Sequence, residues 1–357
     1  MKKSSILTPE DAGFRMPAEW QPHASTWLAW PSHGDLWLEN LEPARDAFVA
    51  LCRALAPDVG KPVSFGEMLE ILVLDDQAER EARRRLKNIK QFVTFRRIPF
   101  GDIWLRDTAP IFLTDDRGRL ASTRFDFNGW GEKYVLEHDD MVSSRIAAAA
   151  GAPTFSCDMI FEGGSVDVDG EGTALTTRQC LLNPNRNPGM TRAEIEDQLR
   201  RYLGLEKILW LDHGLANDHT DGHVDNLARF IGPGVVACMR PSGDDDPNAD
   251  VIREIMNSLK GFRDAQGRRL EIETIPSPGR VLNPEGEVVS ASYMNFFIGN
   301  RSVVVPIFGA DNDDAALEDL ASLFSRHRIV GLNARALISG GGTFHCITQQ
   351  QPQGGVP

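Results

Sequence analysis

The chain has 357 residues, 41% of them hydrophobic, and a formal net charge of -13. This length and apolar content support a sizeable core and permit either one or two domains. The acidic balance, with no basic stretch ready to neutralise phosphates, argues against nucleic acid as a partner. It agrees with a cationic ligand drawn in by electrostatic steering, although an acidic surface that only maintains solubility explains it more simply.

The N-terminal segment and the cysteines indicate the surroundings of the protein. The segment MKKSSILTPEDAGF has two lysines but no apolar core behind them, so we do not expect a secretory signal. The absence of a run of about 18 apolar residues predicts that no segment spans a membrane. The five cysteines are odd in number, scattered and without a CxxC pair, which argues against a disulfide framework or a zinc knuckle. We therefore expect a cytoplasmic protein.

Helices and strands alternate along much of the chain. Four segments have the apolar spacing of amphipathic helices, at 43–56, 191–203, 247–260 and 312–327. The second helix begins with a capping box of Thr191 and Glu194 and ends at Gly204. Short apolar strands follow the last three helices, at 208–212, 270–275 and 328–332. This alternation is typical of an α/β fold.

A looser pattern recurs, in which a polar motif is followed by an apolar strand, a turn with glycine and a second strand. Four copies begin near Asp107, Glu162, His223 and Asn295. A truncated copy, GGTFHCITQ, ends the chain, and STWLAWP near the start supplies its missing half. Spacings of about 50 to 70 residues are typical of a propeller or solenoid, in which the polar motifs would converge on one axis. An ordinary mixed α/β sheet is the alternative.

Cys346 has glycine-rich, polar surroundings, SGGGTFHCITQQ. Glycines at 340–342 free the backbone to approach a ligand, and we place Gly342 among the substrate-binding residues. A nucleophilic cysteine also needs a lowered pKa and a histidine across the site. His345 is the immediate neighbour of Cys346, but neighbours on a strand point to opposite faces, so we do not expect His345 to be the base.

The other four cysteines fit the role of small buried hydrophobic residues. Cys52 lies on a helical stripe, and Cys180 and Cys238 lie on segments that we interpret as apolar strands. Cys157 fits the same interpretation less clearly.

The segment NDHTDGHVDN concentrates histidines and aspartates. If His223 begins a strand, His223 and Asp225 share a face, so one can act as acid or base while the other binds a cation. A rival interpretation is a divalent metal bound by His219, His223 and Asp225, with His213 or His345 completing the set. The HxxxH spacing would suit a helix, but a glycine and a β-branched valine beside the second histidine argue against one.

Two further motifs are candidates for a ligand site, and the first suits a guanidinium. In GDIWLRDTAP, Trp104 can stack on a planar cation and Asp107 can hold it by paired hydrogen bonds. The alternative is a buried tryptophan beside a structural pair of Arg106 and Asp107. In FEGGSVDVDG, Glu162 precedes two glycines, a weak signal that also marks ordinary turns.

Together these motifs closely resemble those of the agmatine deiminase family, which is related to bacterial-type peptidylarginine deiminases. The similarity runs in order from about Met16 to Gln350. It rests on the segments PAEWQPHASTWLAWP, DIWLRDTAP, FEGGS, DHTDGHVDN, MNFFIGN and GGGTFHCITQQ.

The resemblance implies a five-bladed α/β propeller, the guanidine-modifying or pentein fold, with pseudo-fivefold repeats around a central active site. We accordingly expect one catalytic domain over residues 1–357, with 351–357 as a tail. The resemblance also implies no metal, no cofactor, and a small cationic guanidino substrate. A homo-oligomer is compatible with it.

The resemblance further assigns roles to site residues. The nucleophile falls on Cys346, the catalytic histidine on His223 and the active-site glutamate on Glu162. The carboxylates that bind the guanidinium fall on Asp107 and Asp225. In addition, Trp104 matches a pocket position.

Two departures from the family's pattern are visible. Ala109 stands where related sequences often have glycine. Thr343 and Phe344 replace a small residue and an aliphatic one beside the nucleophile, which could reshape the pocket near Cys346.

The expected reaction is deimination of agmatine to N-carbamoylputrescine and ammonia through a covalent amidino-cysteine intermediate. The alternatives within this class are peptidylarginine and other guanidino compounds. Outside the class, the sequence also permits a metal-dependent hydrolase built on His219, His223 and Asp225, or a propeller that only binds cations.

Overall fold

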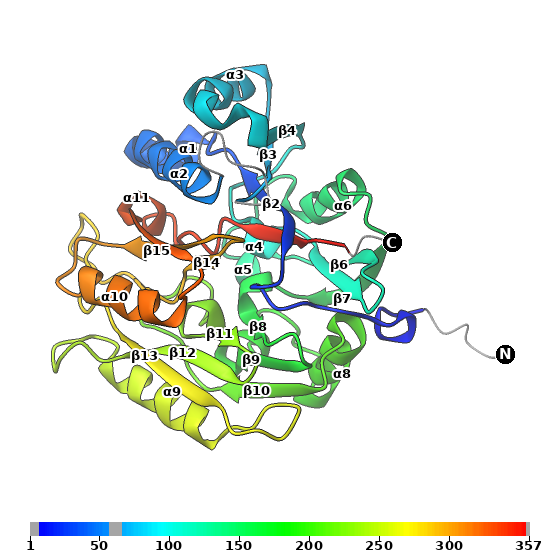
Figure 1. Cartoon of the computed structure of the whole chain (residues 1–357), viewed down its shortest axis with the longest axis vertical. Coiled ribbons are helices and arrows are strands. Elements are labelled where there is room, and N and C mark those ends of the chain that lie inside the picture. The colour runs from blue at the N-terminus through cyan, green and yellow to red at the C-terminus, as the bar shows by residue number, and fades with distance from the viewer. Residues whose placement is uncertain (1–6, 57–65, 355–357) are drawn as a thin grey trace.

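The computed structural model describes residues 7–56 and 66–354. The strands of these residues form five sheets of three or four strands each. Figure 1 shows the sheets around the middle of the molecule, with most of the longer helices toward the outside. The expected absence of a signal at the N-terminus falls partly on residues 1–6, which lie outside the described residues.

The first sheet joins the two ends of the chain. Its strands are β2 (His23–Ala29), β3 (Leu69–Val73), β4 (Val93–Arg97) and β17 (Gln349–Pro352). The strand β17 is antiparallel to β2, whereas β2, β3 and β4 are parallel. The helices of this part are α1 (Gly34–Trp37), η2 (Leu38–Asn40), α2 (Leu41–Leu55), α3 (Asp76–Arg85) and η4 (Lys87–Phe92). The pairing confirms that the first and last copies of the repeated pattern complete each other.

The second sheet contains a hairpin and a returning strand. It orders β1 (Phe14–Arg15), β5 (Ile111–Asp115), β6 (Leu120–Asp126) and β7 (Thr154–Ile160). The helices of this part are η1 (Glu10–Ala12), α4 (Leu105–Thr108), α5 (Gly129–Glu132) and α6 (Asp139–Ala149). The pair β5 and β6 is antiparallel, and β7 lies parallel to β6 after the α6 crossover.

The remaining three sheets repeat the hairpin, the crossover helix and the parallel third strand. Their strands are β8 (Val166–Val168), β9 (Thr173–Thr177) and β10 (Lys207–Leu211); β11 (Ala228–Gly232), β12 (Val235–Arg240) and β13 (Glu271–Pro276); and β14 (Phe297–Ile298), β15 (Ser302–Ile307) and β16 (Arg328–Asn333). Their helices are η5 (Gly163–Ser165), α7 (Arg178–Leu181), α8 (Arg192–Leu203), η6 (Val224–Asn226), α9 (Ala249–Gly261), α10 (Asp313–Leu323) and α11 (Arg335–Ile338). The repeated hairpin pattern is therefore confirmed.

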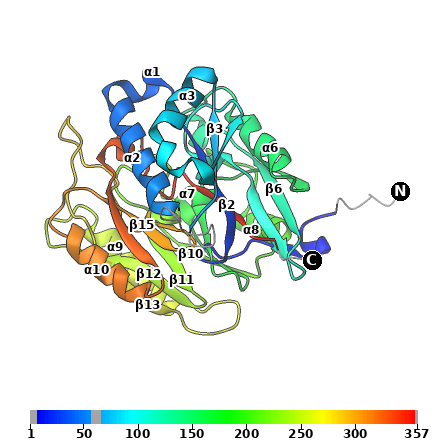
Figure 2. The same cartoon turned by 45° about the horizontal axis from the view of Figure 1, so that its top comes forward.

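Amphipathic helices hold their places through the apolar faces seen in the sequence. Helix α9 buries Ile252, Ile255 and Leu259, and α10 contacts both β13 and β16. Figures 1 and 2 show both helices on the outer side of these strands. Burying three large aliphatic side chains contributes about 5–9 kcal/mol before entropy is counted.

Several local predictions are wrong. Cys180 lies in the short helix α7, whereas Cys238 lies on β12 as expected. No strand begins at His223, which instead precedes η6. Helix α10 ends at Leu323, not at 327. The expected tail at 351–357 is also wrong in part, because residues 351–352 pair within β17. Residues 355–357 lie outside the described residues.

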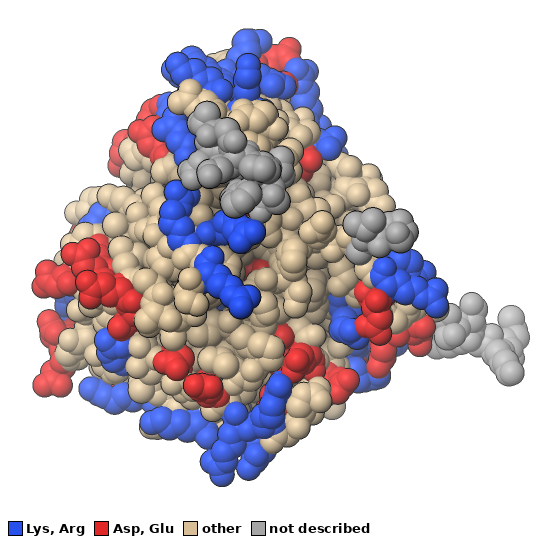
Figure 3. Space-filling view, viewed as in Figure 1, with Lys and Arg blue, Asp and Glu red and all other residues tan. Residues whose placement is uncertain are grey.

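The surface and the helices also bear on possible partners. On the face in Figure 3, Lys and Arg side chains are interspersed with Asp and Glu, so the acidic excess does not form one patch there. Within residues 7–56 and 66–354, each helix is too short or too polar to cross a membrane.

Candidate active site

Short segments that precede three of the hairpins meet the segment before β17 behind a cavity. Gly164, in η5, donates its backbone N–H to Asp107 Oδ1 over 2.9 Å. A Cβ atom at Gly164 would lie 2.6 Å from His223 Nδ1, 3.0 Å from Asp225 Oδ2 and 3.1 Å from Asp107 Oδ1. Only glycine therefore lets these three side chains converge. The backbone N–H of Arg106 donates to the carbonyl of Cys346 over 3.0 Å, which brings the last segment to the same place.

Cys346 lies in a turn and not on a strand, and it is 5% exposed at the cavity wall. Its Sγ lies 3.8 Å from Asp225 Oδ2. Burial raises the pKa of the Cys346 thiol well above its ordinary value, and the negative charges of Asp225 and Asp107 raise it further. The thiol is therefore protonated at neutral pH in this structure.

Asn295 is a neighbour of the sulfur for which the sequence analysis proposed no role. Its Nδ2 lies 3.1 Å from Cys346 Sγ, and the side chain is buried. The sequence did contain a signal for Asn295, because this residue begins one copy of the repeated hairpin pattern. Asp107, Glu162 and His223 hold the same position in the other copies.

His223 and Glu162 form a fully buried pair. His223 Nε2 lies 3.4 Å from Glu162 Oε2. Burial lowers the pKa of His223, but Asp107, Cys180 and Glu162 outweigh it and hold the pKa well above its ordinary value. Nδ1 of the ring lies 3.8 Å from Asp107 Oδ1 and has no hydrogen-bond partner in the described part of the chain. The ring thus carries a proton and has one nitrogen free to act.

Arg186 anchors this pair, and the sequence analysis did not predict it. Its Nε donates to Glu162 Oε1 over 2.7 Å, and its Nη1 reaches Asp221 Oδ2 over 2.6 Å. The side chain of Arg186 is completely buried. Burial raises the pKa of Glu162, but His223 and Arg186 outweigh it and keep the pKa below its ordinary value. Glu162 therefore stays ionised beside His223.

The two aspartates lie in different environments. Asp107 accepts from Gly164 N–H and, over 2.8 Å, from Trp130 Nε1. Burial raises the pKa of Asp107, and His223 only partly opposes it. Asp225 Oδ2 accepts from His345 Nδ1 over 2.7 Å, while its Oδ1 is buried and unpartnered among the described residues. Burial raises the pKa of Asp225, but His345 outweighs it and keeps the pKa below its ordinary value.

His345 is turned away from the sulfur of Cys346. Its ring bridges Asp225 and Glu19, with Nε2 lying 2.8 Å from Glu19 Oε2. The strand argument used for His345 does not apply, because its segment is a turn.

The cavity in front of these residues has a volume of about 210 Å³. Trp104 lines it and stacks on Trp37 with ring centroids 5.8 Å apart. Asp102 accepts from the indole N–H of both tryptophans, over 2.9 Å from Trp37 and 2.8 Å from Trp104. A Cβ atom at Gly342 would lie 2.8 Å from Trp104 and 3.0 Å from the sulfur of Cys346. The wall is therefore aromatic, with acidic groups behind it.

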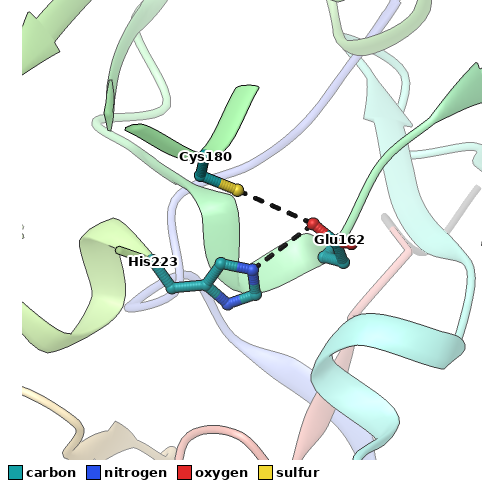
Figure 4. A group of neighbouring side chains, drawn as sticks. All are labelled: Glu162, Cys180 and His223. Atoms are coloured by element: carbon teal, nitrogen blue, oxygen red, sulfur yellow. Dashed lines mark hydrogen bonds and ion pairs between the residues drawn. The ribbon is translucent and has the colours of Figure 1, made fainter. Parts of the chain in front are cut away.

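The rival metal set is not brought together within the described residues. His219 lies at the mouth of the cavity, where its Nδ1 is 2.7 Å from Tyr134 Oη. The side chains that do cluster are those of Glu162, Cys180 and His223 (Figure 4). Both carboxylate oxygens of Glu162 already have partners there, one of them Arg186, and this cation would repel a metal ion. The cluster is a poor fit to a metal site.

Comparisons with known proteins agree with this geometry. The chain belongs to the family of Porphyromonas-type peptidyl-arginine deiminases, whose model matches residues 15–352. The agmatine deiminase of Pseudomonas aeruginosa (strain LESB58) is 38% identical over 368 residues, which cover 97% of each chain. The structure of agmatine deiminase from Enterococcus faecalis matches with a TM-score of 0.90 at 34% identity, over 100% of both chains. The structure of agmatine deiminase from C. Jejuni matches with a TM-score of 0.81 at 28% identity, over 96% of this chain and 97% of its own.

Proposed function

We propose that this protein hydrolyses agmatine to N-carbamoylputrescine and ammonia. The observation that carries the proposal is a thiol at the wall of a 210 Å³ cavity, with two carboxylates and a cationic histidine gathered behind it. This set can bind a guanidinium, attack its carbon and protonate the leaving nitrogen. The relatives called agmatine deiminases, matched over nearly the whole chain, support the same substrate.

Binding comes first. The buried guanidinium donates N–H groups to Asp107 and Asp225, which offset the desolvation of its charge. Asp225 Oδ1 supports this role, because a buried acceptor without a partner in the described chain calls for a donor. Trp104 and the backbone at Gly342 shape the slot beside the sulfur. The arriving positive charge lowers the pKa of Cys346, whose proton leaves to water.

The first half-reaction forms a thioether. The Cys346 thiolate adds to the guanidinium carbon, forming a C–S bond while one C–N double bond becomes single. His223 transfers its proton to an amino nitrogen, the C–N bond breaks and ammonia departs. The remaining amidino-thioether is positive and stays between the carboxylates. Glu162 keeps the His223 ring oriented throughout.

The second half-reaction releases the product. Neutral His223 takes a proton from water, and the hydroxide adds to the amidino carbon. The C–S bond then breaks, its electron pair returns to sulfur, and the remaining hydroxyl proton is lost as the ureido carbonyl forms. The net change is one water consumed and one ammonium released.

The cavity also bears on the choice of substrate. Among its described lining residues none is Lys or Arg, so the α-carboxylate of free arginine would find no cationic partner there. Peptidylarginine or another guanidino compound remains the alternative substrate.

The fold and the domain organisation are further proposals. Four of the five sheets combine a hairpin with a parallel strand, and the fifth pairs β17 from the end of the chain with β2 beside the parallel strands β3 and β4; this arrangement supports a five-bladed propeller and a single domain over residues 1–357. Cytoplasmic location and homo-oligomeric assembly stay predictions.

The test is to incubate the protein with agmatine, arginine or a peptide ending in arginine, and to measure ammonia and ureido product. We expect turnover of agmatine far above that of the other two. Comparable turnover of the peptide would indicate a peptidylarginine deiminase instead. Binding of agmatine without release of ammonia would indicate a protein that only binds cations.

A second measurement separates this proposal from a metal-dependent hydrolase. Dialysis against a strong chelator should leave activity unchanged, while iodoacetamide should abolish it, with agmatine protecting. Loss of activity to the chelator and its return with zinc would overturn the cysteine mechanism.

A further inference from the structure

The amide of Asn295 has a defined orientation beside Cys346. Its Oδ1 accepts from the hydroxyl of Thr343 over 2.6 Å and from the backbone N–H of Cys346 over 3.4 Å. Because two donors point at Oδ1, the other end of the amide is the NH₂ group, and this group lies 3.1 Å from Cys346 Sγ. All three residues are buried, so water does not compete freely for these contacts.

The negatively charged groups around the sulfur of Cys346 oppose its ionisation. Asp225 Oδ2 lies 3.8 Å away, and Asp107 adds a second negative charge nearby. Within the described residues, Asn295 is the side chain whose N–H group is in hydrogen-bond contact with the sulfur. A hydrogen bond to an ionised group stabilises the ion more than its neutral form.

We propose that Asn295 is a catalytic residue whose Nδ2–H donates a hydrogen bond to the Cys346 thiolate, and that Thr343 positions its amide for this task. The proposal rests on the proposed role of Cys346 as nucleophile. During attack the sulfur electron pair enters the C–S bond and the hydrogen bond weakens. When the C–S bond breaks in the second half-reaction, the pair returns to sulfur and the Nδ2–H stabilises the departing thiolate.

This geometry gives the hydroxyl of Thr343 the role of orienting the Asn295 amide. Without this hydroxyl, Asn295 Oδ1 keeps two contacts of 3.4 Å, with the backbone N–H and with Sγ of Cys346. The amide can then rotate by half a turn, which would put Oδ1 in place of Nδ2 at the closer position, 3.1 Å from the sulfur. An oxygen there would disfavour the thiolate. The effect of removing this hydroxyl should therefore have the same sign as the loss of Asn295 and be smaller.

The test follows the alkylation of Cys346 by iodoacetamide against pH, without substrate, by mass spectrometry of the peptide that contains Cys346. In Asn295→Leu the profile should move to higher pH by about one unit, with about tenfold slower alkylation at a fixed lower pH. Thr343→Val should shift in the same direction by less. Thr123→Val is the matched control, since its buried hydroxyl donates to the Tyr202 carbonyl away from the site, and its profile should not move.

The proposal would be overturned if the pH profile of Cys346 alkylation in Asn295→Leu coincided with that of the native protein. An unshifted Thr343→Val would overturn the positioning role of Thr343. If circular dichroism shows that Asn295→Leu does not fold, the same criterion is applied to Asn295→Ser, whose side chain is too short to reach the sulfur. Because the assay contains no substrate, its outcome is independent of the proposed reaction. Native protein that keeps its turnover after alkylation at Cys346 would instead refute the nucleophile assignment.

Discussion

At the scale of single residues, Asp225 acts in two opposing ways in the proposed mechanism. Its charge attracts the guanidinium, but the same charge, 3.8 Å from Cys346 Sγ, keeps the thiol protonated when no cation is bound. The thiolate should therefore form mainly in the substrate complex.

Asp225→Asn separates these two effects. We expect alkylation of Cys346 by iodoacetamide at a fixed pH to become faster, because a charge that raises the thiol pKa is gone. Affinity for agmatine should fall by tenfold or more, since a buried cation loses about 2 kcal/mol of compensation. Calorimetry in a Cys346→Ala background measures the binding. Slower alkylation together with unchanged affinity would contradict both roles.

The sequence carries more signal for the proposed reactive side chains than for the residues that support them. Cys346, His223 and Asp107 stand in motifs whose residue types suggest chemistry. By contrast, Arg186 and Asn295 act through contacts across 24 and 51 residues of chain, to Glu162 and Cys346 respectively. No local pattern encodes such pairings, so the sequence alone did not reveal these contacts, although Asn295 begins one copy of the repeated pattern.

At the scale of elements, the regular repeats were predictable and the segments of the site were not. Hairpins and crossover helices follow from hydrophobic periodicity, which tertiary packing reinforces. The segments at His223 and Cys346 are turns held by side-chain bonds, such as that from His223 N–H to Thr220 Oγ1 over 3.1 Å. The strand interpretation of both segments was therefore wrong in geometry, and their residues enter the site only as part of the proposed mechanism.

The turn at α5 is an element on which the site depends. Trp130 and Gly131 both have positive φ, 54° and 80°, and Trp130 donates to Asp107. A Cβ atom at Gly131 would lie 2.3 Å from Asn185 Nδ2 and 2.7 Å from Arg186 Nη1. The turn can therefore accept nothing larger than glycine unless Asn185 and Arg186, or the turn that carries Trp130, move.

Gly131→Ala should lower kcat/KM for agmatine by about tenfold or more, because the supports of Asp107 and Glu162 shift together. Gly151→Ala is the matched control: Gly151 has φ of 67° and no atom within 4 Å of a new Cβ. This control should lose only about 1 kcal/mol of stability, measured by urea unfolding, and keep its turnover. Equal loss of turnover in both variants would show that strain alone, and not the site, is responsible.

At the scale of the whole molecule, Glu19 links segments from several sheets. Its Oε2 pairs with Arg229 on β11 over 3.0 Å, with Arg106 in α4 over 3.3 Å and with His345 before β17 over 2.8 Å. Its Oε1 accepts from the backbone N–H of Ile298 on β14 over 2.8 Å. The carboxylate is buried and thus joins distant parts of the chain at one point.

Glu19→Gln should destabilise the protein by about 3–5 kcal/mol, since it leaves buried cations uncompensated. The measurement is urea unfolding, with the exposed Asp116→Asn as control, which should leave the midpoint unchanged. Burial raises the pKa of Glu19, but Arg229, His345 and Arg106 together depress it well below its ordinary value. The contribution of the Glu19 charge to stability is therefore complete above about pH 4.3 and is lost as the pH falls through the lower folded pKa. The free energies of unfolding of the native protein and of Glu19→Gln should accordingly converge in acid. A difference independent of pH would contradict this account.

The repeated hairpins and crossover helices were largely predictable because each repeat carries its own periodic signal. The pairing of β17 with β2, across more than 300 residues, was predicted from two incomplete copies of one pattern. The buried charges around Glu19 were not predicted, since nothing in the local sequence distinguishes a central carboxylate from an exposed one. Long-range electrostatics is thus the part that requires the structure.

The central claim is that Cys346 forms a covalent amidino intermediate with agmatine. The most direct measurement is to mix the protein with agmatine, stop the reaction with acid within one turnover, and determine the mass of each cysteine-containing peptide. The account predicts agmatine minus ammonia attached to the peptide with Cys346, absent in Cys346→Ala, which should also lose turnover. An adduct on another cysteine, or undiminished turnover in Cys346→Ala, would contradict it.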